Sequence, residues 1–312
     1  MEQASPPLRE VIKEIIRQHL VRENGLVMGQ CLTAVGWVGG TLPEIYEEGG
    51  MAELSMADVA GGGFAVGAAL AGRRPIYVIR YQGFNWFNAP IILNYACKSK
   101  EIWGRPCPMF IRSIAMEGGI GPVAGSSHHA LYYRMPGVKI YSPMTPEEYR
   151  LTYQDFMAGD DVFYVSEHRG SFANREELED IEHESPDYVL LPISITRFAA
   201  VQASRILMKE GLRVSVHHIF RLKPFSPSKR MVQSLRKSKR GGCVLDDDYA
   251  DGISKALGFD LCSLSGARMD VLGLQDRTAG FASTVDNLPP DALTIADFVR
   301  KQLHTLNHSN ES

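Results

Sequence analysis

The stretch from Leu54 to Trp86 constrains the fold more than any other part of the chain. A short apolar run over 54–57 is followed by a Gly/Ala-rich segment over 61–71, which is typical of a helix, and by a second apolar run over 76–79. Pro75 stands at the start of the second run, where a missing backbone donor is tolerated. The pattern predicts a strand, a helix and a strand, which is the βαβ unit of a parallel sheet.

Asp58 lies between the first strand and the helix of this unit. Ligands of open α/β sheets bind at the carboxyl ends of strands, and Asp58 and the segment 81–86 occupy two such positions. Asp is also a favoured N-cap residue, and the predicted helix follows it closely. Asp58 is therefore either a helix cap or a functional carboxylate, and the spacing leaves both interpretations open.

Length and composition favour an ordinary globular protein. The 312 residues are 45% hydrophobic, which is enough for two domains with cores. A net charge of -3 gives no electrostatic reason to expect nucleic acid or an anionic membrane as a partner. No run of 18 apolar residues occurs, and the first ten residues lack the apolar core of a signal peptide, so we expect a soluble, cytoplasmic protein.

The cysteines are scattered, odd in number and without CxxC spacing. This distribution is typical of a reducing compartment and speaks against a metal site or a disulfide framework. The residues concerned are Cys31, Cys97, Cys107, Cys243 and Cys262.

Strands and helices continue to alternate up to about residue 165, which predicts a parallel sheet with helices on both faces. A charged run follows and ends in Ser185-Pro186. We therefore expect a first domain over residues 1–171, a linker over 172–186 and a second α/β domain over 187–312.

A glycine-rich segment over 117–127 ends in His128 and His129. It lets backbone approach a ligand closely, but it lacks the spacing of a phosphate-binding loop. Two adjacent histidines at the end of a loop are usually exposed to solvent, and a catalytic pair is the alternative. The acidic run Asp246–Asp248 is expected to form a solvated loop, because three consecutive carboxylates point in different directions.

Several motifs together resemble one enzyme family. ADVAGGGFAVGAALAGRRPI, followed by Phe84 and then by SSHHALYYRMPGVKIYSP, resembles the pyrimidine-binding domain of thiamine-diphosphate enzymes. The pattern is similar to the β subunit of the pyruvate dehydrogenase decarboxylase component and to transketolase, and it extends from about Leu8 to Leu303. The resemblance implies an α/β fold with a pyrimidine-binding-type parallel sheet domain, followed by a transketolase C-terminal-type α/β domain.

The resemblance also implies roles for individual residues. Asp58 stands where the family carries a Glu that hydrogen-bonds a ring nitrogen of the cofactor's aminopyrimidine and favours the imino tautomer needed for proton removal. Phe84 matches the aromatic residue that stacks on the pyrimidine ring. His128, or else His129, would contact the substrate, and Gln30 follows a strand that commonly ends in Gly-Glu in this family. Asp is shorter than Glu by one methylene, so a direct hydrogen bond needs a shifted backbone or a bridging water.

In this family the diphosphate is held through a divalent metal by a GDG-to-Asn motif on a different domain. The nearest string here is Gly159-Asp160-Asp161, which lacks the second glycine. The resemblance therefore implies that this chain has no metal ligands of its own. An α-type partner would supply most of the site for thiamine diphosphate and Mg²⁺, in a heterotetramer.

Three functions follow from the resemblance. The first is the β-type subunit of a 2-oxo acid decarboxylase that passes on an acyl group. The second is the C-terminal subunit of a split transketolase, for which basic residues would contact sugar hydroxyls and phosphate. The third is a non-catalytic paralogue that retains the assembly interface. Candidates for the sugar contacts are Arg80, Arg134, His168 and Arg169.

Overall fold

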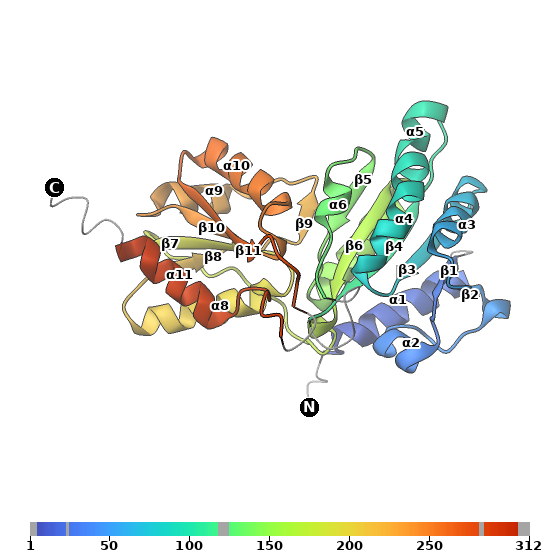
Figure 1. The fold of residues 1–312 in the computed structure, drawn as a ribbon, viewed down its shortest axis with the longest axis horizontal. Coiled ribbons are helices and arrows are strands. Elements are labelled where there is room, and N and C mark those ends of the chain that lie inside the picture. The colour runs from blue at the N-terminus through green and yellow to red at the C-terminus, as the bar shows by residue number, and fades with distance from the viewer. Residues whose placement is uncertain (1–4, 23–24, 118–124, 281–283, 305–312) are drawn as a thin grey trace. The chain divides into compact units, whose positions relative to one another are not determined.

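A computed structural model describes residues 5–22, 25–117, 125–280 and 284–304 of the chain. The chain divides into two compact units (Figure 1). The first comprises the described residues up to Glu177 together with Phe220–Pro224. The second comprises the described remainder, from Leu178 onward without that segment. Two α/β units with largely parallel sheets confirm the predicted fold class.

The first unit is built on a seven-stranded sheet of order β2-β1-β3-β4-β6-β5-β9. All neighbouring strands are parallel except β9, which pairs antiparallel with β5. The strands are β1 (Leu26–Gln30), β2 (Met51–Leu54), β3 (Pro75–Ile79), β4 (Met109–Ala115), β5 (Val138–Tyr141), β6 (Val162–His168) and β9 (Arg221–Lys223).

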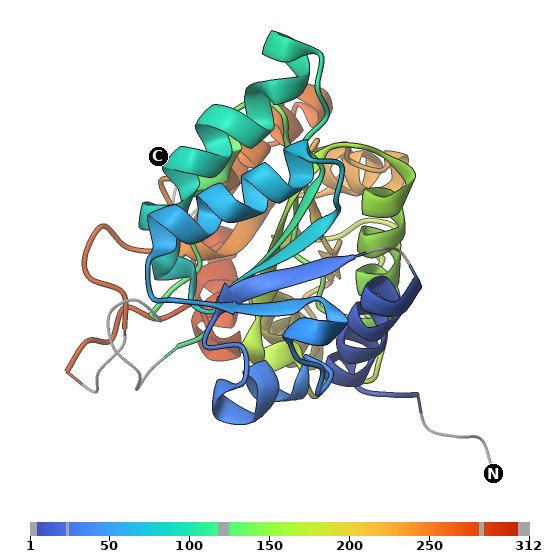
Figure 2. The same cartoon turned by 90° about the vertical axis from the view of Figure 1, so that its right-hand side faces the viewer.

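Helices cover both faces of this sheet (Figures 1 and 2). Apolar side chains of α1 and α7 form one core with the sheet, and α3 and α4 cover the opposite face. The α-helices are α1 (Leu8–Arg22), α2 (Ala34–Gly40), α3 (Asp58–Leu70), α4 (Asn85–Ile91), α5 (Cys97–Trp103), α6 (Ala130–Tyr133) and α7 (Pro146–Ala158). Short 3-10 helices are η1 (Glu47–Gly49), η2 (Gln82–Phe84) and η5 (Arg169–Ser171), and η3 (Ile92–Ala96) is a π-helix.

The predicted βαβ unit is present, but its first two elements begin earlier than expected. The first strand covers Met51–Leu54 rather than 54–57, because its pairing with β1 ends at the partners Gln30 and Leu54. The helix starts at Asp58 rather than at 61. Pro75 is the first residue of β3, as predicted. Because β1 lies between β2 and β3, the carboxyl ends of all three strands meet at one edge of the sheet.

The second unit has a four-stranded parallel sheet of order β11-β10-β7-β8. Helices α8 and α11 pack on one face, and α9 and α10 lie on the other (Figure 1). The strands are β7 (Tyr188–Pro192), β8 (Val214–Val216), β10 (Gly242–Tyr249) and β11 (Met269–Leu274). The helices are α8 (Thr196–Lys209), α9 (Lys229–Lys237), α10 (Ile253–Ser265) and α11 (Ala292–His304).

The acidic run Asp246–Asp248 does not form the solvated loop predicted from the sequence. These residues are the last part of β10, and each is at most 2% exposed. The Ser194 hydroxyl donates to Asp247 Oδ2 at 2.7 Å, and the Tyr249 amide donates to Asp248 Oδ1 at 2.7 Å. The prediction was wrong because β10 runs through these residues to Tyr249: its register against β11 shifts between Leu245 and Tyr249, and Tyr249 pairs again with Leu274.

Across the described ranges, no helix is long and apolar enough to cross a membrane.

Candidate ligand-binding site

A cavity of about 230 Å³ lies at the carboxyl ends of β1 and β3 in the first unit. It brings together three residues that the sequence singled out separately, Gln30, Asp58 and Phe84. Gln30 ends β1, Asp58 begins α3, and Phe84 ends the turn η2 that follows β3. The remaining lining residues are Cys31, Met56, Tyr77, Val78, Ile79, Arg80, Tyr81 and Asn88.

The carboxylate of Asp58 is held by a side-chain relay. Asn88 Nδ2 donates to Asp58 Oδ1 at 2.9 Å, and the Tyr77 hydroxyl donates to Asn88 Oδ1 at 2.6 Å. The helix-cap interpretation of Asp58 is wrong, because Ala57 holds the N-cap position and no side chain caps this end of α3. Asp58 is the first helical residue, where the helix dipole favours a negative charge. Among the described hydrogen bonds, only Oδ1 of this carboxylate is engaged.

Tyr77 fixes the orientation of the Asn88 amide. Burial, and secondly the charge of Asp58, raise the pKa of Tyr77 well above its ordinary value, so the phenol keeps its proton near neutral pH. A phenol that donates must face the carbonyl oxygen of Asn88, and the amide nitrogen is then directed at Asp58 and at the Phe84 carbonyl, 3.0 Å away. The relay therefore presents a donor, never an acceptor, to the carboxylate.

Glycines in α3 make room for this relay. A Cβ at Gly61 would lie 2.8 Å from the Tyr77 hydroxyl, closer than side chains normally approach. A Cβ at Gly62 would lie 3.4 Å from Asn88 Oδ1. The Gly/Ala-rich sequence of this helix thus lets it lie close to β3 and α4.

Gln30 contributes a buried amide nitrogen to the cavity. Its Nε2 has no hydrogen-bond partner in the described part of the chain. A buried donor without an acceptor costs about 1–3 kcal/mol. Because Gln30 also lines the cavity, a ligand acceptor placed there would remove this cost.

His128 and His129 do not line this cavity. The His128 amide donates to Gln82 Oε1 at 2.6 Å, which ties it to the short helical turn that carries Phe84. Its ring nitrogen Nε2 lies 3.2 Å from Ser126 Oγ. Burial, and secondly the charge of His129, lower the pKa of His128 from 6.5 to about 4, so the ring is neutral near pH 7.

The expectation that both histidines face solvent is wrong for His129. This side chain is fully buried, and its Nδ1 lies 3.4 Å from Ser166 Oγ at the end of β6. Residues 118–124 of the glycine-rich segment before the two histidines lie outside the described residues.

Buried side-chain amides connect the segment that carries Phe84 to neighbouring strands, and they were not predicted from the sequence. Gln82 Nε2 donates to Ser166 Oγ at 2.8 Å and to the Ser113 carbonyl at 3.1 Å. Asn85 Nδ2 donates to Ser113 Oγ at 3.0 Å. Together with Asn88, these amides recur every third residue after a buried strand. That spacing was a usable signal for one polar helical face above the strand ends.

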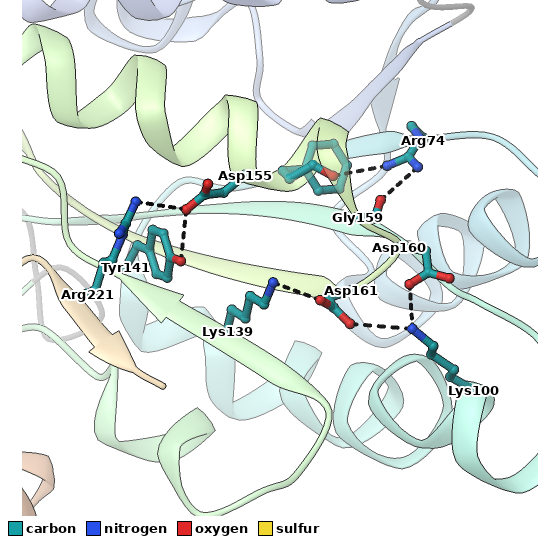
Figure 3. A network of polar contacts seen from close by, with 10 residues as sticks. Arg74, Lys100, Lys139, Tyr141, Asp155, Gly159, Asp160, Asp161 and Arg221 are labelled. Atoms are coloured by element: carbon teal, nitrogen blue, oxygen red, sulfur yellow. Dashed lines mark hydrogen bonds and ion pairs between the residues drawn. The ribbon is translucent and has the colours of Figure 1, made fainter. Parts of the chain in front are cut away.

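The string Gly159-Asp160-Asp161 belongs to a network of ion pairs at the turn between α7 and β6 (Figure 3). Lys100 Nζ lies 2.6 Å from Asp160 Oδ1, and Lys139 Nζ lies 2.8 Å from Asp161 Oδ2. These contacts attach the turn to α5 and to β5. Each carboxylate is thus paired with a lysine of the same unit.

The chain is an α/β protein of the open-sheet class, with a carboxylate, an aromatic ring and a buried amide around a cavity at the carboxyl edge of its sheet, which is where proteins of this class bind their ligands. Residues 6–174, more than half of the chain, match the family model of the transketolase pyrimidine binding domain. The chain belongs to this family.

Known proteins resemble the chain over most of its length. It is 22% identical to the pyruvate dehydrogenase E1 component subunit beta of Rickettsia felis, over 94% of this chain and 97% of the relative. It is 23% identical to the 2-oxoisovalerate dehydrogenase subunit beta of Bacillus subtilis, over 78% and 80%. A solved structure described as a split gene transketolase, inactive beta4 tetramer, superposes with a TM-score of 0.72 at 16% identity, over 96% and 98% of the two chains. The chain is a distant homologue of the two dehydrogenase β subunits, and it shares its fold with the solved split transketolase.

Proposed function

We propose that this chain is the β-type subunit of a two-chain thiamine-diphosphate enzyme that decarboxylates a 2-oxo acid and transfers the acyl group. The observation that carries the proposal is the fixed Asp58 carboxylate in a cavity shared with Phe84 and Gln30. The names of the relatives, β subunits of pyruvate and 2-oxoisovalerate dehydrogenases, support the substrate class.

The cavity residues fit an aminopyrimidine ring. Phe84 offers an aromatic face, Asp58 an acceptor for a ring N–H, and Gln30 a buried donor without an acceptor. When bound, the cofactor supplies the carbon nucleophile and the electron sink of the reaction. The chain's own residues orient the ring and control one proton on it.

Asp58 is proposed to accept a hydrogen bond from the ring through Oδ2, because Oδ1 is engaged by Asn88. The Tyr77–Asn88 relay keeps the carboxylate in one orientation without neutralising it, since both relay members are uncharged. An ionised acceptor forms a hydrogen bond about twice as strong as a neutral one. This fixed geometry orients the acceptor, while the shorter reach of Asp relative to the family's Glu is to be bridged by a shifted backbone or by a water.

His128 is proposed to contact the substrate as a neutral imidazole. With a pKa of about 4, it holds a proton in only about one molecule in a thousand at pH 7. It is therefore suited to exchange a hydrogen bond with the substrate as a neutral ring, and it is poorly suited to act as a general acid or as a strong base. His129 is the second candidate for this contact.

An exposed apolar face supports an α-type partner. After Asp58, helix α3 contains no charged residue, and its exposed side carries Val59, Phe64 and Gly67. On the neighbouring α4, Trp86 and Phe87 expose more than half of their surface. Figure 2 shows α3 and α4 side by side. An apolar face of this kind is typical of subunit interfaces. We propose that it meets the α-type chain, which supplies the groups for the diphosphate and Mg²⁺ in a heterotetramer.

A split transketolase subunit is the second candidate, favoured by one residue of the cavity. Arg80 lines the cavity and packs against the Tyr81 ring at 5.6 Å, where a guanidinium could meet a phosphate. His168 is less suited to sugar contacts, because its Nε2 lies 2.8 Å from Glu117 Oε1. A non-catalytic paralogue is the third reading, since Asp58 and Gln30 both depart from the family's Glu.

The test is to co-express the chain with an α-type chain and to titrate the complex with thiamine diphosphate and Mg²⁺ by calorimetry. Native protein, Asp58→Ala and Asp58→Glu are compared on panels of 2-oxo acids and ketose phosphates. Glu147→Gln is the matched control, because it alters an exposed carboxylate on α7, across the sheet from α3.

The proposal expects cofactor binding, turnover of a 2-oxo acid, and loss of turnover in Asp58→Ala alone. Turnover of ketose phosphates only would establish the second candidate. A complex that forms but binds no cofactor would contradict both enzymatic candidates and favour the non-catalytic paralogue.

A further inference from the structure

The second unit holds a cavity of about 320 Å³ at the end of its sheet where β10 begins. Its walls are the turn after α9, over 238–241, and the turn after α10, over 265–268. Leu235 and Arg236 of α9 and Gln302 of α11 complete it. None of these residues belongs to the family-matched segment or to the site beside Asp58.

The charged residues of this lining are all cations, namely Arg236, Lys239, Arg240 and Arg268. Carboxylates outside the lining compensate two of them. Lys239 Nζ lies 2.5 Å from an oxygen of Asp187, and Arg268 Nη2 lies 3.0 Å from an oxygen of Asp270. The other two cations have no carboxylate partner among the described ion pairs, which leaves the cavity with an excess of two positive charges.

Helix capping accounts for the position of Arg236 but not for that of Arg240. Arg236 Nη2 donates to the Leu264 carbonyl at 2.8 Å in the last turn of α10, a common role for a basic residue near a helix C-terminus. Arg240 is half-buried in the wall of the cavity, and its guanidinium has no hydrogen-bond or ion-pair partner in the described part of the chain. A partly buried cation with five unused donors favours an anionic ligand.

Hydrogen bonds hold the two turns in place without a ligand. Ser238 Oγ donates to the Gly241 carbonyl at 2.7 Å, and the Gly242 amide donates to the Arg268 carbonyl at 3.0 Å. Gly241 has a φ of +76°, and a Cβ there would collide with the Arg268 carbonyl. The backbone around Arg240 is therefore preorganised, which lowers the entropy lost on binding.

We propose that this cavity binds a small phosphorylated molecule, a phosphate monoester or a diphosphate. Two uncompensated arginines match the charge of a phosphate dianion, and the planar guanidinium fork matches the geometry of its oxygens. The volume is that of a pocket for a small ligand. Nothing in this inference depends on the function proposed for the site beside Asp58.

The test uses the full-length chain and isothermal calorimetry at low ionic strength, with inorganic phosphate, pyrophosphate and acetate as probes. Native protein is compared with Arg240→Gln, with the pair Arg236→Gln and Arg240→Gln, and with Arg205→Gln. Arg205 is an exposed arginine on α8 of the same unit that does not line the cavity, so it controls for net charge. The melting temperature of each variant shows whether it folds.

Phosphate and pyrophosphate are expected to bind the native chain and the Arg205→Gln variant at one site, while acetate does not bind. Arg240→Gln should weaken binding about tenfold, and the double variant should abolish measurable binding. Equal affinity in native protein and Arg240→Gln, with both folded, would overturn the proposal. So would the absence of phosphate and pyrophosphate binding to the native chain. A single-stranded oligonucleotide that binds through Arg240 more tightly than pyrophosphate would overturn the assignment to a small ligand.

Discussion

The cavity beside Asp58 and the cavity beside Arg240 differ in how their polar groups are held. In the first, one carboxylate is oriented by Asn88, which is itself oriented by Tyr77, so each group has one permitted direction. In the second, Arg236 stands on α9 and the other three cations stand on backbone turns, and the side chain of Arg240 has no partner among the described residues. The first arrangement fixes the direction of each polar group, whereas the second gathers positive charge around a side chain that no residue holds. Substitutions that change the charge of a side chain or the direction of its hydrogen bonds should therefore distinguish the two cavities.

The largest effect is expected for Asp58→Asn. The new amide keeps the size of the side chain and can still accept a hydrogen bond from Asn88 Nδ2, but it carries no charge. Turnover of the two-chain complex should fall at least about 100-fold, the scale of a lost acid–base group, while the melting temperature stays close to native. Steady-state rates and thermal unfolding of the same preparation check this. Near-native turnover would show that the charge of Asp58 is dispensable.

His128 should make the stability of the first unit depend on pH. Its pKa is about 4 in the folded chain and 6.5 when exposed, so the unfolded chain binds more protons between these values. The contribution of the neutral His128 ring to the free energy of unfolding is fully present above pH 6.5 and is lost as the pH falls toward 4. At 1.36 kcal/mol per pH unit, about 2–3 kcal/mol disappears between pH 7 and pH 4.5.

The measurement is the free energy of unfolding of native protein and His128→Gln across this range. As the pH falls, the free energy of unfolding of the native chain should decrease relative to that of His128→Gln. A difference that does not change with pH would place His128 in a more hydrated environment than the structure shows.

Tyr77→Phe tests whether the relay beside Asp58 matters. The change leaves the buried oxygen of Asn88 without its donor and allows the amide to turn away from Asp58. The free energy of unfolding should drop by about 1–2 kcal/mol, the cost of a buried unpaired acceptor. Tyr95→Phe on an exposed tyrosine of η3 is the control. Urea unfolding distinguishes the two, and equal midpoints would mean that the relay does not stabilise the fold.

The sequence predicted the elements of the fold better than the contacts of the site. The alternation of strands and helices in the first unit followed from the apolar runs, and the start of β3 followed from Pro75. The contacts of Asp58 did not follow, because its partner Asn88 comes from a separate helix and the residue that orients Asn88 comes from a strand. Such a relay depends on the distance between α3 and β3, which the absence of a side chain at Gly61 sets only in the folded chain.

The prediction of a solvated loop over Asp246–Asp248 was wrong for a related reason. Local composition favours solvent for three consecutive carboxylates, but β10 continues through them as a buried strand and pairs again with β11 at Tyr249 after a shift in register. Ser194, more than fifty residues earlier, then supplies a donor to Asp247. Long-range contacts of this kind leave no signal in the local sequence. By contrast, Gln82, Asn85 and Asn88 recur every three residues, and this spacing indicates one polar helical face.

The smallest effect is expected for Arg240→Lys, and it sharpens the contrast between the two cavities most directly. The substitution keeps the charge of the second cavity but replaces a planar fork by a point charge. If charge rather than geometry governs this cavity, phosphate affinity should fall only about twofold to fivefold, against about tenfold for Arg240→Gln. Raising the salt concentration from about 50 to 300 mM should weaken phosphate binding in both native protein and Arg240→Lys, because the attraction is screened. A loss as large as that of Arg240→Gln would mean that Arg240 grips its ligand through the geometry of its fork, and the second cavity would then resemble the first.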